Sequence, residues 1–276
     1  MIEEIKVHEH GRVVLMDIMG SDHDIADAAR ISYGKGTKSV SDDRGLIRYL
    51  MRHWHTTPFE MVELKFALKM PIFIARQHLR HRTASVNEYS GRYSVMSDDF
   101  YLPPLDKIKP QSLTNKQGRD GTFTAAEAES VQHAMSSTFE KAHREYRHMI
   151  DPDVDATREL ARIVLPVANY TEMYWKIDLH NFFHYIRLRM DGHAQEEIRD
   201  YATAMYNMVK ARLPIACEAF EDYRFNAVTL SAGEVRAVDD LISGIFRDDA
   251  AYYSMGAREW REFNDKWGAA IARKRK

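Results

Sequence analysis

Polar side chains are concentrated in the segment 80–94, "RHRTASVNEYSGRYS", without the alternation of a strand face or the apolar stripe of a helix. The fork of an arginine guanidinium matches the geometry of a phosphate group. Glu88 and Ser90 add an acceptor and a hydroxyl, and Gly91 lets the backbone approach a ligand closely. A loop that supplies phosphate donors and partners for a base edge together indicates a nucleotide site.

The stretch before this segment, "PIFIARQHLRHR", predicts a helix that begins at Pro71, where the missing N–H of proline is harmless. Successive residues of a helix turn by about 100°, so Gln77, Arg80 and His81 are expected to share one face. Taken alone, such a helix could be an ordinary surface helix. The segment that follows it favours a binding role.

Cys217 is the only cysteine of the chain, and it lies among apolar neighbours in "LPIACEAF". We therefore expect a buried thiol that packs in the core. A cysteine nucleophile would need a pKa lowered by nearby bases or by a helix N-terminus. A single cysteine also excludes an internal disulfide framework and fits a reducing compartment.

Four separated motifs carry a family resemblance. The segment "RHRTASVNEYS" fits the pattern Arg-His-Arg, seven residues, Ser, and "GRYS" follows it directly. "HTTPFE" (55–60) precedes it, and "ARIVLP" (161–166) and "LRMDGHAQ" (188–195) come later. In this order the motifs resemble the flavin-dependent thymidylate synthases. The resemblance extends from about residue 11 to 223, and it leaves out the end of the chain and the loop near 105–123.

The resemblance implies an enzyme that carries out the reductive methylation of dUMP to dTMP. Methylenetetrahydrofolate would supply the carbon, and FAD, reduced again by NADPH, would supply the electrons. The other class of thymidylate synthase attacks uracil with a cysteine thiolate. Because Cys217 is expected to be buried, the pyrimidine must instead be activated by stabilising its negative charge. By similarity the catalytic residue is Arg189, whose guanidinium never deprotonates.

The resemblance also implies the ligand-binding residues. The dUMP positions fall on Gln77, Arg80, Glu88, Ser90, Gly91, Arg92, Arg162 and Arg189. The FAD positions fall on His55, Thr57, Arg80, His81, Arg82, Glu88, Asp178, His180 and His184. Ser90 could be considered as a nucleophile, but without a base to activate it we prefer a hydrogen-bond donor to the nucleotide.

These residues must be positioned by a fold that the hydrophobic pattern indicates. Buried or alternating apolar residues predict strands over 11–20, 62–70 and 169–177. Helices are expected from Ser21, over 43–54, from a capping box at 124–127, over 155–166, over 178–212 and from Pro214. The strands are spaced irregularly, so the fold class is α+β, with a central, mostly antiparallel sheet flanked by long helices. We expect a family domain over 1–225 and a helical C-terminal extension over 226–276, in which "SAGE" (231–234) caps a helix and Trp260, Phe263 and Trp267 form a stripe.

The expected helix over 178–212 has a geometric consequence. His184 and Arg189 project about 140° apart on a straight helix, and His180 and Arg189 about 180° apart. One small ligand site cannot easily receive side chains that project in such different directions. We therefore expect this helix to serve two sites that partner chains complete, in agreement with the homotetramer that the family resemblance implies, in which active sites lie at subunit junctions.

Two other classes of function remain open. Thirteen histidines, with His180 and His184 four apart, suggest a metal hydrolase, but no HExxH motif and no third ligand are evident, so no metal is expected. A nucleotide- or RNA-binding module without catalysis could use the arginines and tyrosines of 80–94 as a stacking platform. The net charge of -2 does not favour a nucleic-acid partner.

The sequence also indicates in which compartment of the cell the protein is found. The start of the chain has no apolar signal region, and no run of about 18 apolar residues is present to span a membrane. Hydrophobic residues make up 45% and charged residues 29% of the chain, as in ordinary globular proteins. The sequence therefore predicts a cytoplasmic protein without a membrane partner.

Overall fold

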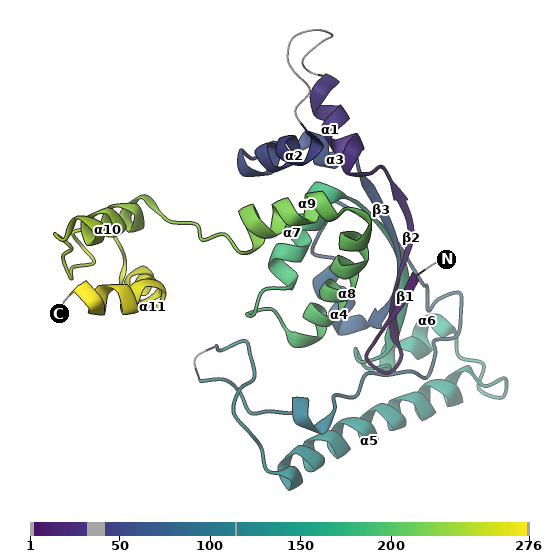
Figure 1. Ribbon diagram of the computed structural model, residues 1–276. Coiled ribbons are helices and arrows are strands. Elements are labelled where there is room, and N and C mark those ends of the chain that lie inside the picture. Colours follow the sequence, from purple (N-terminus) through teal and green to yellow (C-terminus); the bar gives the residue numbers. More distant parts are fainter. Residues whose placement is uncertain (1–2, 32–41, 114, 275–276) are drawn as a thin grey trace. The chain divides into compact units, whose positions relative to one another are not determined.

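The structure is a computed structural model that describes residues 3–31, 42–113 and 115–274. The chain forms two compact units, Met1–Phe225 and Asn226–Lys276. Each unit contains a hydrophobic core of its own. Figure 1 labels the elements of both units, which are described separately below.

The first unit is built on a five-stranded sheet with the strand order β1-β2-β3-β5-β4. All neighbouring strands of this sheet run antiparallel. The strands are β1 (Glu3–Val7), β2 (Gly11–Met19), β3 (Glu63–Pro71), β4 (Ser85–Glu88) and β5 (Tyr170–Asp178). The predicted α+β class with a mostly antiparallel sheet is confirmed.

The central strands β3 and β5 follow the alternation that their sequences predict. Leu64, Phe66 and Leu68 are buried in β3, whereas Lys65 between them is exposed. Phe66 lies opposite Trp175 of β5, which is fully buried. One face of the sheet therefore carries the core, and the predicted strands over 11–20, 62–70 and 169–177 are confirmed to within one residue at each end.

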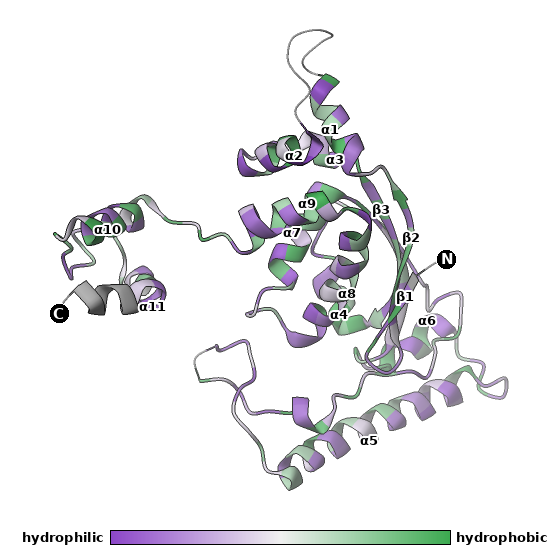
Figure 2. Ribbon diagram, in the orientation of Figure 1, coloured by the Kyte–Doolittle hydropathy of each residue, from purple (hydrophilic) through white to green (hydrophobic). Residues whose placement is uncertain are grey.

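Helices cover the apolar face of the sheet, and Figure 1 shows α4, α7 and α8 within its curve. Figure 2 shows hydrophobic and hydrophilic residues mixed along α2, α5 and α9, as amphipathic elements require. The helices of this unit are α1 (Asp22–Arg30), α2 (Asp43–Arg52), α3 (Thr57–Glu60), α4 (Ile72–His78), α5 (Ala125–Ile150), α6 (Arg158–Ala161), α7 (Leu179–Arg189), α8 (Glu196–Arg212) and α9 (Pro214–Phe220). Shorter turns are η2 (Leu105–Lys107), η3 (Arg162–Val164) and the π-helix η4 (Glu221–Phe225).

The capping box at the start of α5 is confirmed, because Thr124 and Glu127 exchange side-chain to backbone hydrogen bonds. The long irregular segment before α5 is tied to the N-terminus of α8. Arg119 and the hydroxyl of Tyr101 both donate to Glu197, which is almost fully buried. The loop is therefore fixed at one end of α8 by a buried carboxylate.

The predicted single helix over 178–212 is wrong. It is two helices, α7 and α8, separated by residues 190–195. In this break the Asp191 carboxylate accepts hydrogen bonds from the backbone N–H and the ring of His193. Short polar side chains that bond to the nearby backbone compete in this way with the hydrogen bonds of a helix. Gly192, next to Asp191, also has a low helix propensity.

Two expectations near the polar segment also need correction. Residues 85–88 form β4, although their side chains show no alternation, because this edge strand is exposed on both faces and is held by backbone pairing to β5. Pro71 ends β3 and is the N-cap of α4 rather than lying in its first turn, and α4 ends at His78. Leu79 and Arg80 therefore form a turn after the helix, and His81 follows that turn.

The second unit contains α10 (Ala232–Ser243) and α11 (Ala257–Lys274). Ser231 and Glu234 form the predicted capping box of α10. Phe263 is fully buried, and Trp260 and Trp267 pack against the same small core, so the predicted stripe is confirmed. No helix within the described ranges of the chain is long and apolar enough to cross a membrane.

Candidate active site

An open hollow of about 800 Å³ lies between the end of α4 and the outer face of α7. Its lining includes four arginines and no aspartate or glutamate. We call it the arginine hollow; its polar lining residues are Arg76, Gln77, Arg80, His81, Arg82, Thr83, Asn181, His184 and Arg189. Guanidinium groups without carboxylate neighbours suit a ligand that carries phosphate.

Arg189 is held in this hollow by two acceptors. Its Nε donates to Nε2 of His81 at 3.0 Å, and its Nη2 donates to the backbone carbonyl of Gln77 at 3.2 Å. To accept from arginine, His81 must be neutral and carry its proton on Nδ1. Burial, and next the charge of Arg189, lower the pKa of His81 to about 4. Arg189 is therefore oriented by a neutral histidine, and its other N–H groups remain available to a ligand.

A second histidine supports this pair from the core. His78 is fully buried, and its Nδ1 lies 3.2 Å from the hydroxyl of Tyr185. Burial is the main reason that its pKa falls to about 3, with His81 and Arg189 adding to the effect. The centroid of the His78 ring lies 4.3 Å from the ring centroid of Trp175. The rings that lie beneath Arg189 are thus neutral and closely packed.

A second hollow of about 530 Å³ lies on the other side of α4, and we call it the loop hollow. Its polar lining includes Glu88, Arg162 and Thr171. Glu88 accepts a hydrogen bond of 2.8 Å from the Thr171 hydroxyl. A Cβ at Gly91 would lie 2.9 Å from Met96 Sδ and 3.3 Å from Arg162 Cδ, so only a glycine fits this close approach without displacement.

The predicted dUMP residues are divided between the two hollows. Gln77, Arg80 and Arg189 line the arginine hollow, whereas Glu88, Gly91 and Arg162 line the loop hollow. Ser90 and Arg92 line neither one, and Arg92 makes an exposed ion pair of 2.8 Å with Glu159. Within one chain, α4 separates the two groups of predicted nucleotide residues.

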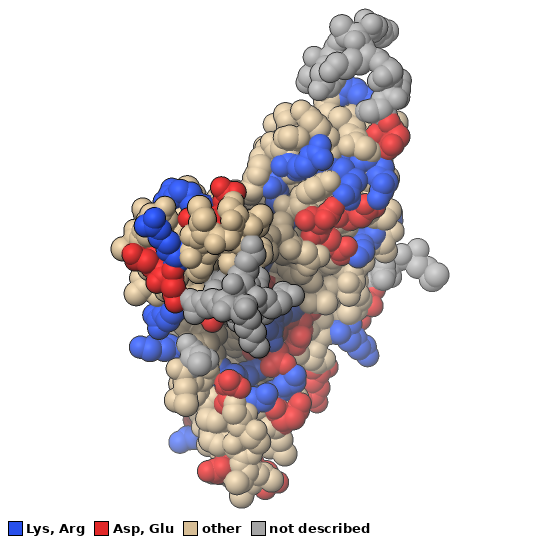
Figure 3. Space-filling model, turned by 60° about the vertical axis from the view of Figure 1, so that its left-hand side comes forward, with Lys and Arg blue, Asp and Glu red and all other residues tan. Residues whose placement is uncertain are grey.

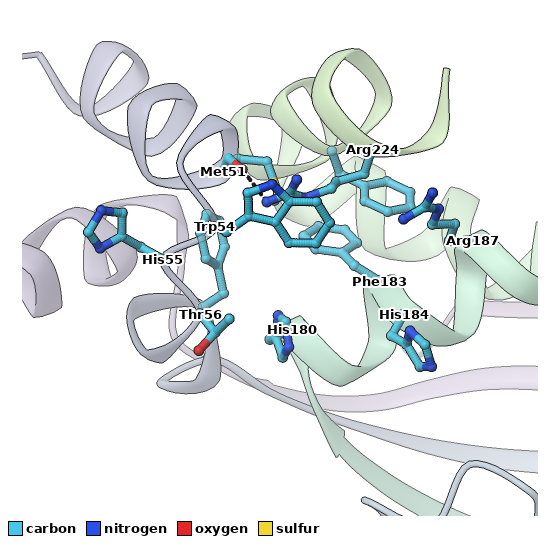
Figure 4. A pocket seen from close by; sticks show the side chains of 11 residues that line it. Met51, Trp54, His55, Thr56, His180, Phe183, His184, Arg187 and Arg224 are labelled. Carbon is cyan, nitrogen blue, oxygen red and sulfur yellow. Dashed lines mark hydrogen bonds between the residues drawn. The ribbon is translucent and has the colours of Figure 1, made fainter. Parts of the chain in front are cut away.

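A third hollow of about 80 Å³ lies on the remaining face of α7 and is shown in Figure 4. We call it the tryptophan hollow; it is lined by Met51, Trp54, His55, Thr56, Phe59, His180, Phe183, His184, Arg187, Phe220 and Arg224. His180, His184 and Arg187 share one face of α7, as their spacing requires. The predicted separation of His180 from Arg189 is confirmed, but the prediction for His184 is wrong, because His184 lies at the border and lines both hollows.

The predicted FAD residues fall mainly on these two connected hollows. Arg80, His81, Arg82 and His184 line the arginine hollow, and His55 and His180 line the tryptophan hollow with His184. Thr57, Glu88 and Asp178 line neither one, and Glu88 lines the loop hollow instead.

The Asp178 carboxylate instead caps α7, accepting from the backbone N–H of Asn181 at 2.8 Å and from its side-chain amide at 2.6 Å. Three basic lining residues were not predicted from the sequence: Arg76, Arg187 and Arg224. The spacing of Arg187 three residues after His184 was an available signal.

Cys217 is fully buried, and burial raises the pKa of its thiol to about 12. The prediction of a packing thiol is therefore confirmed. Since the chain contains no other cysteine, no cysteine thiolate is available as a nucleophile. Among the residues that the structure describes, no group of three or more His, Cys, Asp or Glu side chains could hold a metal ion.

The α+β fold carries an arginine-lined hollow that suits anionic ligands, and the only cysteine of the chain is buried. The family model described as "Thymidylate synthase complementing protein" matches residues 14–215. The flavin-dependent thymidylate synthase of Ruegeria pomeroyi is 49% identical over 95% of this chain and 87% of its own. That of Dictyostelium discoideum is 46% identical over 95% and 86%. The chain belongs to the flavin-dependent thymidylate synthase family.

A solved structure supports the same relationship. The UMP/dUMP methylase PolB from Streptomyces cacaoi, bound with 5-Br dUMP, is 31% identical, with a TM-score of 0.70 over 79% of this chain and 98% of that chain. The curated relatives match 95% of the chain, so their similarity includes much of 226–276. The expectation that the resemblance ends near residue 223 is wrong for them, because it was based on short ligand-binding motifs, which the second unit lacks.

Proposed function

We propose that this protein catalyses the reductive methylation of dUMP to dTMP, with methylenetetrahydrofolate as the carbon donor and FAD and NADPH as the reductants. The observation that carries the proposal is the orientation of Arg189 by His81 and the Gln77 carbonyl at the wall of a hollow without carboxylates. Membership of the family and the similarity to a dUMP methylase support it.

In this proposal the chain binds and polarises the pyrimidine. Arg189 acts as the catalytic residue by stabilising negative charge that develops on the ring when its C5 becomes nucleophilic. Because the guanidinium is already held by two acceptors, little reorganisation is needed when the charge appears. FAD supplies the reducing equivalents when it is bound. Arg80, Arg82 and His184 suit its diphosphate and ring, and His55 and His180 extend that surface.

The dUMP site is proposed to be shared between chains. Gln77, Arg80 and Arg189 lie on one side of α4, and Glu88, Gly91 and Arg162 lie on the other. Within a single chain α4 lies between the two groups, and Arg76 is the one described residue that lines both hollows. We infer that the arginine hollow of one chain meets the loop hollow of another, in agreement with a homotetramer whose active sites lie at subunit junctions.

The site lies in the first unit, so we assign the chemistry to residues 1–225 and treat 226–276 as an accessory extension.

Figure 3 shows Lys and Arg side chains intermingled with Asp and Glu on the visible face. This face offers no broad basic surface to a nucleic acid, so it gives the RNA-binding alternative no support.

The visible spectrum of the purified protein tests the proposed function. In the absence of oxygen, we expect a yellow protein that NADPH bleaches and that is oxidised again only when dUMP and methylenetetrahydrofolate are both present, with dTMP as the product. UMP in place of dUMP measures the selectivity for the sugar. A colourless protein that does not bind added FAD, or one that binds FAD and forms no dTMP, would contradict the proposal.

A further inference from the structure

Asn169 is a fully buried polar residue that holds three separate segments together. Its backbone carbonyl accepts from the N–H of Ile72 at 2.8 Å, and its own N–H donates to the Pro166 carbonyl at 3.0 Å. Its side-chain amide donates to the Ser97 carbonyl at 3.1 Å. Ile72 and Pro166 line the loop hollow, and Ser97 directly follows Met96, which also lines it. The walls of the loop hollow therefore meet at one asparagine.

The side-chain oxygen of Asn169 contacts a histidine of α5. Its Oδ1 lies 3.0 Å from Nε2 of His143, which is only 6% exposed. The Ser97 carbonyl can only accept a hydrogen bond, so it fixes the amide of Asn169 with its nitrogen towards Ser97 and its oxygen towards His143. His143 must therefore carry a proton on Nε2 and donate it to Asn169.

The other ring nitrogen of His143 faces a second acceptor, because Nδ1 lies 3.3 Å from Oδ1 of Asp98. Burial lowers the pKa of His143 below its ordinary value, although the bond to Asn169 and the charge of Asp99 act in the opposite direction. A neutral ring with its proton on Nε2 has no hydrogen to donate from Nδ1. Asp98 is instead held by Arg147, whose Nε donates to it at 2.9 Å. The bond to Asn169 is thus the contact through which His143 can act.

We propose that His143 is a positioning residue for the nucleotide: by donating from Nε2 to Asn169, it fixes the segments that form the walls of the loop hollow. The inference rests on the proposed function, in which this hollow contributes Gly91 and Arg162 to the dUMP site. His143 lines none of the three hollows, so its effect on dUMP must pass through Asn169 and the walls. Because a Cβ on Gly91 would lie only 2.9 Å from Met96 Sδ, a shift of this wall reaches the nucleotide loop directly.

His143→Leu and His143→Gln test this role, because leucine removes the donor, whereas glutamine keeps an N–H at a similar reach. His133→Gln is the matched control, since His133 is an exposed histidine of the same helix. Calorimetry with dUMP measures the dissociation constant of each FAD-loaded variant. Steady-state kinetics separates the KM for dUMP from kcat, and thermal unfolding reports the stability of each variant.

His143→Leu should raise the dissociation constant and the KM for dUMP by roughly tenfold, the scale of a buried acceptor that has lost its donor. The kcat at saturating dUMP should stay close to that of the wild type, because Arg189 and its two acceptors belong to the arginine hollow. His143→Gln should recover most of the affinity, and His133→Gln should not change it. A loss of stability in His143→Leu with unchanged dUMP binding would show a merely structural role and overturn the proposal, as would a His143→Gln variant as impaired as His143→Leu.

Asp98→Asn provides a second variant that does not depend on the folding of His143→Leu. Its amide can donate to Nδ1 of the neutral ring, so its affinity for dUMP should equal or exceed that of the wild type. If His143 acted instead as an imidazolium paired with Asp98, this variant should bind dUMP about tenfold more weakly, and that result would overturn the proposal. All of these results require a wild-type protein that binds dUMP and makes dTMP, so they are distinct from failure of the proposed function.

Discussion

The two hollows on opposite sides of α4 differ in how firmly the protein holds the arginine that lines each of them. In the arginine hollow, Arg189 is fixed by a ring nitrogen at 3.0 Å and a carbonyl at 3.2 Å, above a floor of buried rings. In the loop hollow, Arg162 follows the short helix α6 and packs against Gly91, with no carboxylate partner in the described ranges. The arginine hollow is therefore preorganised for charge, whereas the loop hollow holds its arginine without such partners, and under the proposal above the two belong to one site only when different chains meet.

The largest expected effect is at the fixed arginine. Arg189→Ala should lower kcat by about 10²–10³, because it removes charge stabilisation that develops only during the reaction. Steady-state rates of dTMP formation measure it. Arg189→Lys keeps the charge but loses the fork and should recover only part of the rate. An Arg189→Ala enzyme as active as the wild type would remove the basis of the mechanism.

Mixing inactive chains tests whether the two hollows belong to different subunits. Arg162→Ala and Arg189→Ala, each strongly impaired alone, should regain activity in mixed oligomers, because some sites then combine an intact arginine hollow with an intact loop hollow. His184→Ala mixed with Arg189→Ala is the control. The orientation of the two side chains on a long helix had predicted that this pair would complement.

Since His184 and Arg189 line the same hollow, we now expect no rescue from that control pair. Rescue of the control pair, or none for the first pair in verified hybrids, would contradict the assignment of the hollows. Separation of differently tagged chains verifies the hybrids.

A smaller effect is expected from the residue that orients Arg189. His81→Ala should lower kcat roughly tenfold, through loss of one charge-assisted hydrogen bond, whereas His81→Gln should retain most of the rate because its amide oxygen can accept. The pKa of about 4 keeps His81 neutral, so no loss of activity near pH 6.5 should come from this group. A pH profile of kcat that changes near pH 6.5 in the wild type and not in His81→Gln would argue against this role.

The smallest effect concerns stability. His78 and His81 have pKa values lowered from 6.5 to about 3 and about 4, so between these values and 6.5 the unfolded chain binds more protons than the folded one. The free energy of unfolding should therefore fall as the pH is lowered from 7 towards 4. Urea unfolding at several pH values measures it.

His78→Gln should flatten this dependence, while the exposed His133→Gln should not change it. An equal pH dependence in the wild type and in His78→Gln would show that the buried histidine does not titrate in this way.

Sequence reasoning was successful where short-range pattern decides the structure. The alternation in β3 and the capping boxes at Thr124 and Ser231 predicted their elements correctly. Sequence reasoning failed where long-range pairing of strands, or competition between side chains and backbone for hydrogen bonds, decides the structure. β4 has no apolar face to read, and the break after Arg189 depends on an aspartate that bonds to nearby backbone.

The sequence by itself determined the motif residues, the α+β class and the absence of any second thiol, because these follow from residue types and periodicity along the chain. Only the tertiary structure decided that α4 divides the predicted dUMP residues between two hollows, and that Arg189 is held by His81. It also brought Arg224 onto Trp54, far away in the sequence. The reason is that the directions and neighbours of side chains are set by the packing of α4 and α7 on the sheet, and no local pattern encodes that packing.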